Sequence, residues 1–470
     1  MFDLLSRFSN LNPRHWPKYI FVIGVLFLSA VLPMLSLKDD LFLLLILIAI
    51  TGLIGVLIIL YQPELGFILI IIGGAFIPFQ GPGGVNSTVL IVFFLFGIWL
   101  FRLLTKTIST TYIPSQITLP VLCFFVVAMI AFGTGQMPWF SFAGQAPMDA
   151  QIGGMMIYVL SLIAFVLMAN LVRDLQWLEW ITWTYIATGA IYIVLGRLIF
   201  QVGLNSRLVE DLFSDGYKGS VFWVWFAVLT FSQAIFNQRL HNLWRIAIGG
   251  LTIATLYSGY FQAGGWKSGW IPPLAAVVTL IVLRWRKILF LAPLALIPGL
   301  NIMRQVIAED QYSFSTRLEA WAILTEITKV NPILGLGFAN YYWYTPLFPI
   351  RGFAVRFNSH NQYVDIIAQM GFIGLFVFLW IFWELGKLGW SLRKHVPEGF
   401  AKAYVYATLG GLVGMLIAGL LGDWVMPFVY NVGMLGMRSS IIGWMFLGGL
   451  VSLNSMVTLE RSMTPDASFS

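Results

Sequence analysis

The sequence has few charged residues. Asp, Glu, Lys and Arg make up 10% of its 470 residues, against about 25% in soluble domains. Hydrophobic residues reach 59% and the mean hydropathy is +0.85, so this scarcity excludes an ordinary soluble protein. Many apolar runs approach the ~20 residues with which a helix crosses a bilayer. Because backbone groups in lipid must bond within their own segment, the sequence predicts an all-α polytopic membrane protein.

Other features are also scarce or missing. Cys123 is the single cysteine and lies in an apolar run, which excludes an intrachain disulfide. No dense group of carboxylates occurs in the predicted outer loops, and the alternation typical of a membrane barrel is absent. The scarcity of carboxylates in the outer loops agrees with the absence of a metal site. We also expect no cofactor and no nucleic-acid partner. The first apolar run is long enough to span, so we expect no cleavable signal peptide.

Fourteen apolar runs are present, of which 66–80 and 288–300 are short for a full span, so we predict 12 to 14 transmembrane helices in a single integral membrane domain, 1–470. The tail, 453–470, is expected to be disordered and cytoplasmic. The runs are 19–36, 41–60, 66–80, 88–104, 116–136, 150–172, 177–203, 217–236, 242–262, 266–283, 288–300, 359–385, 400–421 and 436–452.

Lysine and arginine placement predicts the orientation. With the N-terminus inside, alternate loops carry the positive charges, such as the cluster at 284–287 and Lys387, whereas the loop 137–149 has none. This pattern predicts that both termini are cytoplasmic. Two predicted outer loops, 204–218 and 301–358, do contain arginine and lysine. Either a long loop translocates regardless of its charge, or some of these side chains, such as Arg356, meet an anionic ligand.

The long extracytoplasmic loop 301–358 is expected to hold short helices. Thr316 and Glu319 fit a capping box, which predicts a helix from about Arg317 to Lys329. Arg317 would then lie in the first helical turn, where free N–H groups favour an anion. The alternative is an ion pair between Arg317 and Glu319 or another neighbour.

His360 stands out among the four histidines of the chain. The predicted topology places the other three at cytoplasmic ends and His360 at the outer start of an apolar helix. Its side chain is matched to proton transfer near neutral pH. The alternative is an interfacial histidine, or a cap shared with Ser359 and Asn361.

Three groups of residues in this order resemble the O-antigen ligase/polymerase family, of the Wzy–WaaL type. The groups are Arg317 with Trp321, then Pro332 with Gly335 and Gly337, then His360 and Asn361 near Gly371 and Gly374. The resemblance implies a GT-C-like fold in the bacterial inner membrane, with the active site on the extracytoplasmic face.

The resemblance also implies an activity. Such enzymes transfer a glycan from undecaprenyl diphosphate to an acceptor hydroxyl on a glycan, lipid A-core or protein, without a metal and with inversion, in O-antigen, lipopolysaccharide or exopolysaccharide synthesis. Arg317 would stabilise the diphosphate, and His360 would act on the acceptor hydroxyl. Gly335, Gly337 and Asn361 would contact substrate.

The sequence departs from the family at one arginine. Relatives often carry a Ser-Arg pair near 264–270, where this chain has no arginine, although Lys267 could reach the same helix face. Lys267 could instead extend to the outer surface. Arg207 and Lys218 are further candidates for an anion contact. Gln369 also stands where relatives often have glutamate.

Other hypotheses remain for the function of the whole chain. A transporter or lipid-linked glycan flippase is the main alternative, although such proteins favour charged residues within their spans. A structural scaffold would leave the Arg317 and His360 pattern unexplained. The four aromatic residues at 341–344 could stack on sugars or anchor the loop at the interface.

Overall fold

The computed structural model describes residues 52, 55–77, 79–105, 114–199, 219–262, 265–291, 300–301, 304–305 and 308–463. Within these ranges the chain forms helices and no strand, which confirms the all-α prediction. Eight helices of the described ranges are long and apolar enough to cross a membrane. The predicted run 19–36, and most of 41–60 and 288–300, lie outside the described residues. The predicted total of 12 to 14 spans therefore stays a prediction.

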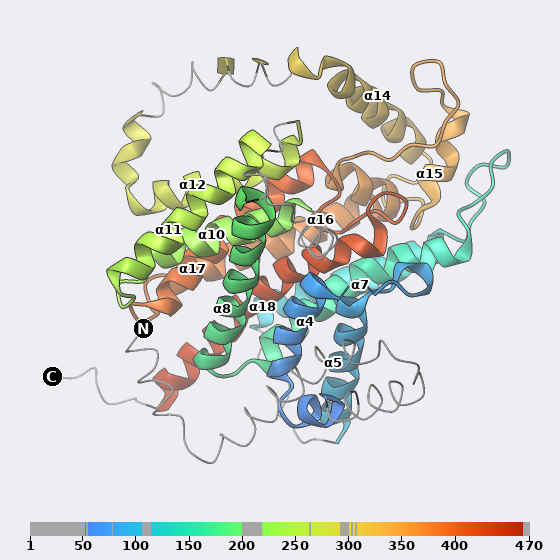
Figure 1. Ribbon diagram of the computed structural model, residues 1–470. Helices are drawn as coiled ribbons and strands as arrows, with labels where there is room; N and C mark the ends of the chain where they lie inside the picture. Colours follow the sequence, from blue (N-terminus) through green and yellow to red (C-terminus); the bar gives the residue numbers. More distant parts are fainter. Residues whose placement is uncertain are drawn as a thin grey trace, which may run out of the picture. The chain divides into compact units, whose positions relative to one another are not determined.

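The remaining predicted runs coincide with helices (Figure 1). Their bounds are α4 Glu64–Phe76, α5 Ser87–Leu104, α6 Ser115–Thr134, α7 Met148–Leu171, α8 Leu175–Ile191, α10 Ser220–Phe236, α11 Asn242–Tyr257, α12 Lys267–Arg284, α16 Gln362–Leu392, α17 Phe400–Leu421 and α18 Gly433–Met463. Turns of π-helix extend α8 over Tyr192–Ile199 and α11 over Ser258–Gln262. Short 3-10 segments are Pro82–Gly84, Arg286–Leu291 and Thr345–Leu347. The long loop contributes α14, Gln311–Thr328, and α15, Asn340–Tyr344.

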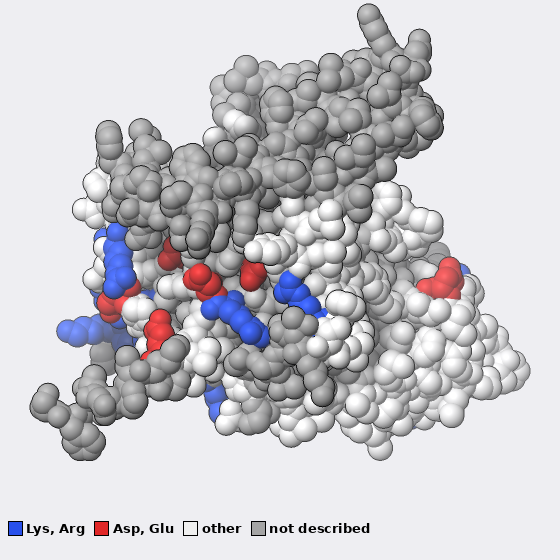
Figure 2. Space-filling model, turned by 90° about the horizontal axis from the view of Figure 1, so that it is seen from below, with Lys and Arg blue, Asp and Glu red and all other residues white. Residues whose placement is uncertain are grey.

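The helices pack in two groups joined by α16. Helix α7 packs along α18, while α10, α12 and α17 pack against one another, and α16 contacts α6 and α17 (Figure 1). Helices α7 and α18 are apolar around most of their circumference, and such helices are stable when buried. Seen from below, the described Lys, Arg, Asp and Glu side chains gather over one half of the view, and the described surface of the other half is almost uncharged (Figure 2).

Helix α16 is interrupted at Gly371. Gly371 has φ 68° and ψ −173°, which are not helical values. The turn after α14 fills this break: the N–H of Phe372 donates to the Pro332 carbonyl at 2.9 Å, and the N–H of Gly337 donates to the Gln369 carbonyl at 3.0 Å. The long loop is therefore fixed to α16 through backbone hydrogen bonds.

Two predictions about chain organisation differ from the structure. Helix α18 continues to Met463, so residues 453–463 are not a disordered tail. Leu453 and Val457 extend its buried face by one turn at a spacing of four residues, beyond the predicted end of the apolar run at residue 452. The chain also divides into two compact units, 1–66 and 67–470, in place of one domain. Most of the first unit lies outside the described residues.

Candidate active site

Three chain segments meet at the end of α17. The Ser268 hydroxyl, in the first turn of α12, donates to the Leu421 carbonyl at 2.9 Å. The side-chain amide of Asn361, at the start of α16, donates to the Leu420 carbonyl at 3.3 Å. The free carbonyls at a helix end are therefore bonded by the beginnings of two other helices. The residues that follow α17 lie beside both of these helix starts.

His360 lies at this junction in a left-handed backbone conformation. Its φ is 47°, an uncommon value for a residue other than glycine. The flanking Ser359 and Asn361 are buried, whereas the His360 side chain is exposed. Asn361 caps α16, because its side-chain oxygen accepts from the N–H groups of Tyr363 and Val364 at 2.9 and 3.2 Å. Asn361 is therefore the N-cap of α16, and the His360 imidazole does not act as a cap.

The charges around His360 come from two other elements. Partial desolvation by the surrounding protein lowers the pKa of His360, the negative charge of Asp423 opposes this effect, and the positive charge of Arg317 adds to it. Asp423 follows α17, and Arg317 belongs to α14. The carboxyl of Asp423 and the guanidinium of Arg317 are therefore both close enough to act on the imidazole.

Asp423 is a buried carboxyl with fixed partners. Its Oδ2 accepts from the N–H of Phe428 at 2.8 Å, and its Oδ1 accepts from the Asn431 side-chain amide at 2.7 Å. Burial raises the pKa of Asp423, while these two hydrogen bonds and the charge of His360 act to lower it. Because both partners are donors, they hold the carboxyl in the form that accepts hydrogen bonds.

The capping box predicted at Thr316 is wrong. Helix α14 begins at Gln311 after Asp310, and the Thr316 hydroxyl donates back to the Tyr312 carbonyl at 2.7 Å within the helix. The chain from 311 to 315 therefore continues the helix before the predicted start. Arg317 consequently lies beyond the first turn, and the free N–H groups of a helix end cannot serve an anion there.

Arg317 does not form an ion pair with Glu319, which was the alternative to its contact with an anion. Glu319 instead bonds Arg351, accepting from Nε at 3.1 Å and from the backbone N–H at 3.0 Å. Among the residues that the structure describes, Arg317 makes no ion pair and no hydrogen bond. Its side chain is half-buried. A guanidinium with unused donors therefore lies within electrostatic range of His360.

Gly335 and Gly337 pack the loop against other backbone segments. Both have positive φ, 74° and 84°. A Cβ on Gly335 would lie 2.5 Å from the Met370 nitrogen, and one on Gly337 would lie 2.1 Å from the Gly135 Cα. Their N–H groups donate to carbonyls of the protein. These glycines therefore allow the backbones to pack closely, and their contact with substrate stays a prediction.

The other predicted contacts have different settings. Lys267 is half-buried at the first position of α12, next to Trp266, whose ring packs against Trp424 at 5.5 Å between centroids. Lys267 thus lies close to the turn that carries Asp423. Arg207 and Lys218 lie outside the described residues.

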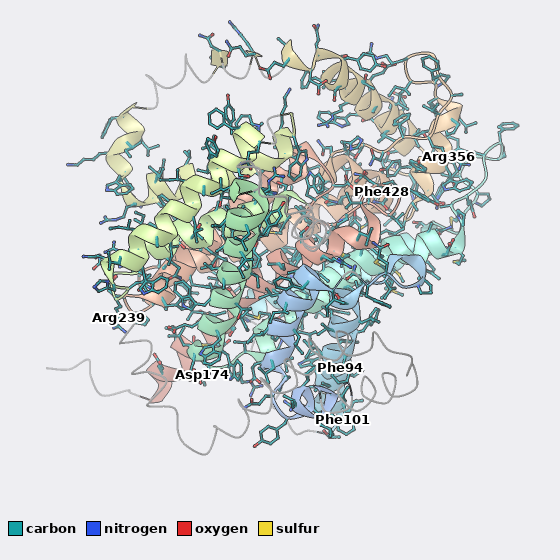
Figure 3. The ribbon with its side chains drawn as sticks, in the orientation of Figure 1. Phe94, Phe101, Asp174, Arg239, Arg356 and Phe428 are labelled. Carbon is teal, nitrogen blue, oxygen red and sulfur yellow. The ribbon has the colours of Figure 1, made fainter. Side chains whose placement is uncertain are left out.

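Arg356 is exposed and stacks on an aromatic ring. Its guanidinium carbon lies 3.6 Å from the centroid of Trp343, whose indole N–H donates to the Tyr430 hydroxyl at 2.8 Å. Figure 3 shows Arg356 beside the short helix α15, and Phe428 nearer to the long helices. In the aromatic run, Tyr341 and Tyr344 are buried, and Tyr342 and Trp343 are partly exposed. The first pair anchors the loop, and the second pair remains accessible.

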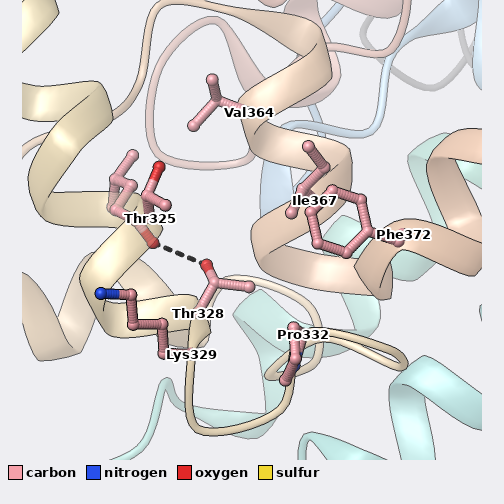
Figure 4. A pocket seen from close by; sticks show the side chains of 8 residues that line it. Thr325, Thr328, Lys329, Pro332, Val364, Ile367 and Phe372 are labelled. Atoms are coloured by element: carbon pink, nitrogen blue, oxygen red, sulfur yellow. Dashed lines mark hydrogen bonds between the residues drawn. The ribbon is translucent and has the colours of Figure 1, made fainter.

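A small apolar cavity lies between α14 and α16 (Figure 4). Its volume is about 120 Å³. It sits against the C-terminal half of α14, about two turns beyond Arg317. The cavity is lined by Leu324, Thr325, Thr328, Lys329, Pro332, Val364, Ile367 and Phe372. It contains none of the groups around His360, so we place the candidate site at His360 and not in the cavity.

Sequence reasoning missed Asp423 and the buried Asp365 of α16. Asp423 stands alone between Gly422 and Trp424 after a long apolar run, so no motif drew attention to it. A usable signal was its position, because it is an acidic residue where a span was predicted to reach the outer face. Asp365 was hidden in a helix whose other residues are mostly apolar.

A family model described as O-antigen ligase matches residues 223–379. The match covers about a third of the chain and includes both Arg317 and His360. Asp423 lies beyond it. No curated protein matches the chain.

Proposed function

We propose that this membrane protein, in which residues 223–379 match a family model described as O-antigen ligase, is a member of the O-antigen ligase/polymerase family and transfers a glycan from an undecaprenyl-diphosphate carrier to an acceptor hydroxyl. Family membership implies a glycosyl-transfer enzyme. The donor, the extracytoplasmic site in the bacterial inner membrane, and a metal-independent mechanism with inversion are parts of the proposal. Acceptors of this class are a glycan, lipid A-core or a protein.

The observation that carries the proposal is the unpaired guanidinium of Arg317 near His360. A diphosphate leaving group gathers negative charge as its bond to the anomeric carbon breaks. A fixed guanidinium stabilises such charge through charge-assisted hydrogen bonds. Arg317 is half-buried and makes no hydrogen bond or ion pair in the described part of the chain, so its donors are available to the diphosphate.

His360 is suited to take the proton of the acceptor hydroxyl. Its lowered pKa keeps the imidazole neutral at pH 7, as a general base requires. The hydroxyl oxygen forms a bond to the anomeric carbon, its proton passes to His360, and the diphosphate leaves with the electron pair of the broken bond. Asp423 then favours the imidazolium, since its negative charge raises the pKa of His360.

A second cation is required if the diphosphate is to be held at both phosphates. Lys267 is the candidate with a described position, because it lies near Trp424 and the Asp423 turn. Arg207 and Lys218 remain candidates from the sequence, and Arg356 is a candidate for contact with the glycan. We propose that Lys267 acts as a point charge, because an ammonium lacks the fork of a guanidinium.

Reconstitution separates an enzyme from a lipid-linked glycan flippase. The purified protein is placed in liposomes with an undecaprenyl-diphosphate-linked glycan, with and without an acceptor, and both product formation and donor movement between leaflets are measured. The proposal predicts acceptor-dependent release of undecaprenyl diphosphate. If the donor moves between leaflets and no glycan is transferred, under conditions that support synthesis in cells, the result would favour the flippase.

A further inference from the structure

A buried polar cluster lies directly behind His360. It consists of Ser359, Asp365 and Tyr341, whose side chains are all at most 1% exposed. Asp365 Oδ1 is hydrogen-bonded to the Ser359 hydroxyl at 2.9 Å and to the Tyr341 hydroxyl. Polar groups buried in this way are costly unless each has a partner. The cluster is therefore a feature that packing alone does not require.

One oxygen of Asp365 has no such partner. Asp365 Oδ2 is buried and makes no hydrogen bond among the described residues. Apolar residues of similar shape in place of Asp365 and its hydroxyl partners would avoid this cost, because replacing both partners of a buried hydrogen bond is often nearly neutral. Ionisable residues at membrane depth usually have a functional reason to be there. Asp365 thus calls for an explanation other than stability.

Ser359 is restrained by hydrogen bonds with three residues, Trp321, Asn361 and Asp365. Its carbonyl accepts from the Trp321 indole N–H at 2.8 Å, and its hydroxyl oxygen accepts from the N–H of Asn361 at 2.9 Å. The hydroxyl proton lies within reach of two acceptors, Asp365 Oδ1 at 2.9 Å and the Asn361 carbonyl at 2.8 Å. The next residue, His360, has φ 47°. A side chain that favours other conformations keeps this one only where its surroundings impose it. The contacts of Ser359 supply that restraint.

The same contacts tie His360 to the helix of Arg317. Trp321 lies one helical turn after Arg317 on α14, because residues four apart share a helix face. The Trp321–Ser359 hydrogen bond therefore fixes the segment that carries the imidazole against the helix that carries the guanidinium. Asp365, from α16, adds a second restraint through the Ser359 hydroxyl.

We propose that Asp365 is a positioning residue that acts through Ser359 to hold His360 in its left-handed conformation beside Arg317 and Asp423. The inference rests on the proposed function, because it assumes that His360 must be placed for proton transfer. The role requires an acceptor at Oδ1 and makes no use of Oδ2. An asparagine at position 365 should therefore preserve this role, and a leucine should not.

The test compares Asp365→Asn, Asp365→Leu and Ser359→Ala in the full-length protein. Asp365→Asn should retain most of the wild-type kcat. Asp365→Leu and Ser359→Ala should each lower kcat by about 10²-fold, as expected for a misplaced reacting group, with the KM of the donor unchanged. Tyr341→Phe removes one donor to Asp365, and Tyr404→Phe is its matched control, since Tyr404 is also buried and donates to a single carbonyl, that of Phe446.

A second readout does not depend on transfer. Diethyl pyrocarbonate modifies neutral histidine, and peptide mapping separates His360 from the other three histidines. We expect Asp365→Leu and Ser359→Ala to change the modification rate of His360 in the same way, and Asp365→Asn and Tyr404→Phe to leave it at the wild-type value. This readout tests positioning even if His360 proves dispensable for transfer, so the two proposals fail separately.

Three results would overturn the inference. One is a loss of kcat in Asp365→Asn as large as that in Asp365→Leu, which would show that the charge matters and the acceptor does not. Another is an unchanged His360 modification rate in a folded Asp365→Leu or Ser359→Ala protein. The third is full additivity of Ser359→Ala and Asp365→Leu, because two residues in one restraint should show coupled effects.

Discussion

At the scale of single residues, three charged or titratable groups from three elements share one environment. Arg317 comes from α14, His360 from the start of α16, and Asp423 from the turn after α17. Arg317 and Asp423 move the pKa of His360 in opposite directions. Partial desolvation has the largest effect on the pKa of His360, and these two charges adjust the pH at which the imidazole becomes neutral and able to accept a proton.

The pH dependence of transfer tests this balance. Activity of the wild type should rise with pH as His360 loses its proton, with a midpoint below the ordinary histidine pKa because partial desolvation by the surrounding protein lowers the pKa. Asp423→Asn removes the charge that raises the pKa of His360, so the midpoint should move to lower pH. Arg317→Gln removes the charge that lowers the pKa, so the midpoint of the residual activity should move to higher pH.

The measurement is the pH profile of kcat/KM, which reports the free enzyme. His395→Ala serves as the control, since His395 is exposed near the end of α16 that is predicted to be cytoplasmic. It should leave the profile unchanged. Midpoints that move in the same direction in Asp423→Asn and Arg317→Gln would contradict the arrangement.

At the scale of elements, the site depends on the docking of a loop onto a broken helix. The turn that contains Gly335 and Gly337 enters the break of α16 and exchanges backbone hydrogen bonds with residues 368–373. The loop thereby brings α14, and with it Arg317, to a fixed place beside the start of α16. Glycine is needed where the two backbones approach most closely.

Gly337→Ala should destabilise the protein, and Gly352→Ala should do so much less. Both glycines have positive φ, 84° and 80°, so both variants carry a backbone strain of about 1–3 kcal/mol. The added Cβ meets the Gly135 Cα at Gly337 and nothing within 4 Å at Gly352. Thermal melting in detergent measures the difference. Equal melting temperatures for the two variants would show that close approach is not what Gly337 provides.

At the scale of the whole molecule, the candidate site lies at one end of the helices, which the positive charges of the sequence predict to be extracytoplasmic. The start of α16, the end of α17 and the start of α12 meet there. A lipid-linked diphosphate would present its charge at the same level, at the membrane surface. The orientation is thus part of the proposed function and is open to direct measurement.

Cysteine labelling measures the orientation. The single Cys123 is replaced by serine, and cysteine is introduced at Phe142, which is 92% exposed, or at the exposed Lys394. A membrane-impermeant maleimide added outside should label Phe142→Cys and leave Lys394→Cys unlabelled until the membrane is opened. The reverse pattern would place the site on the cytoplasmic face and contradict the proposed donor chemistry.

Long apolar runs were sufficient to predict the fold class and the positions of most described helices, because such runs admit few alternatives. Arg317 and His360 were found through motif order, and their proximity fits the roles predicted for them. The start of α14 was misplaced because a capping box at Thr316 also fits a helix interior. Asp423 and Asp365 were missed because their importance depends on contacts between segments far apart in the sequence, which one sequence does not reveal.

The most direct test of the central claim is the rate of glycan transfer in liposomes by Arg317→Ala and His360→Ala beside the matched controls Arg351→Ala and His395→Ala. The account predicts that Arg317→Ala lowers kcat by about 10²–10³-fold and His360→Ala by about 10²–10⁴-fold. The controls should transfer glycan at nearly the wild-type rate, since Arg351 is already paired with Glu319. Full transfer by folded Arg317→Ala or His360→Ala protein would contradict the account.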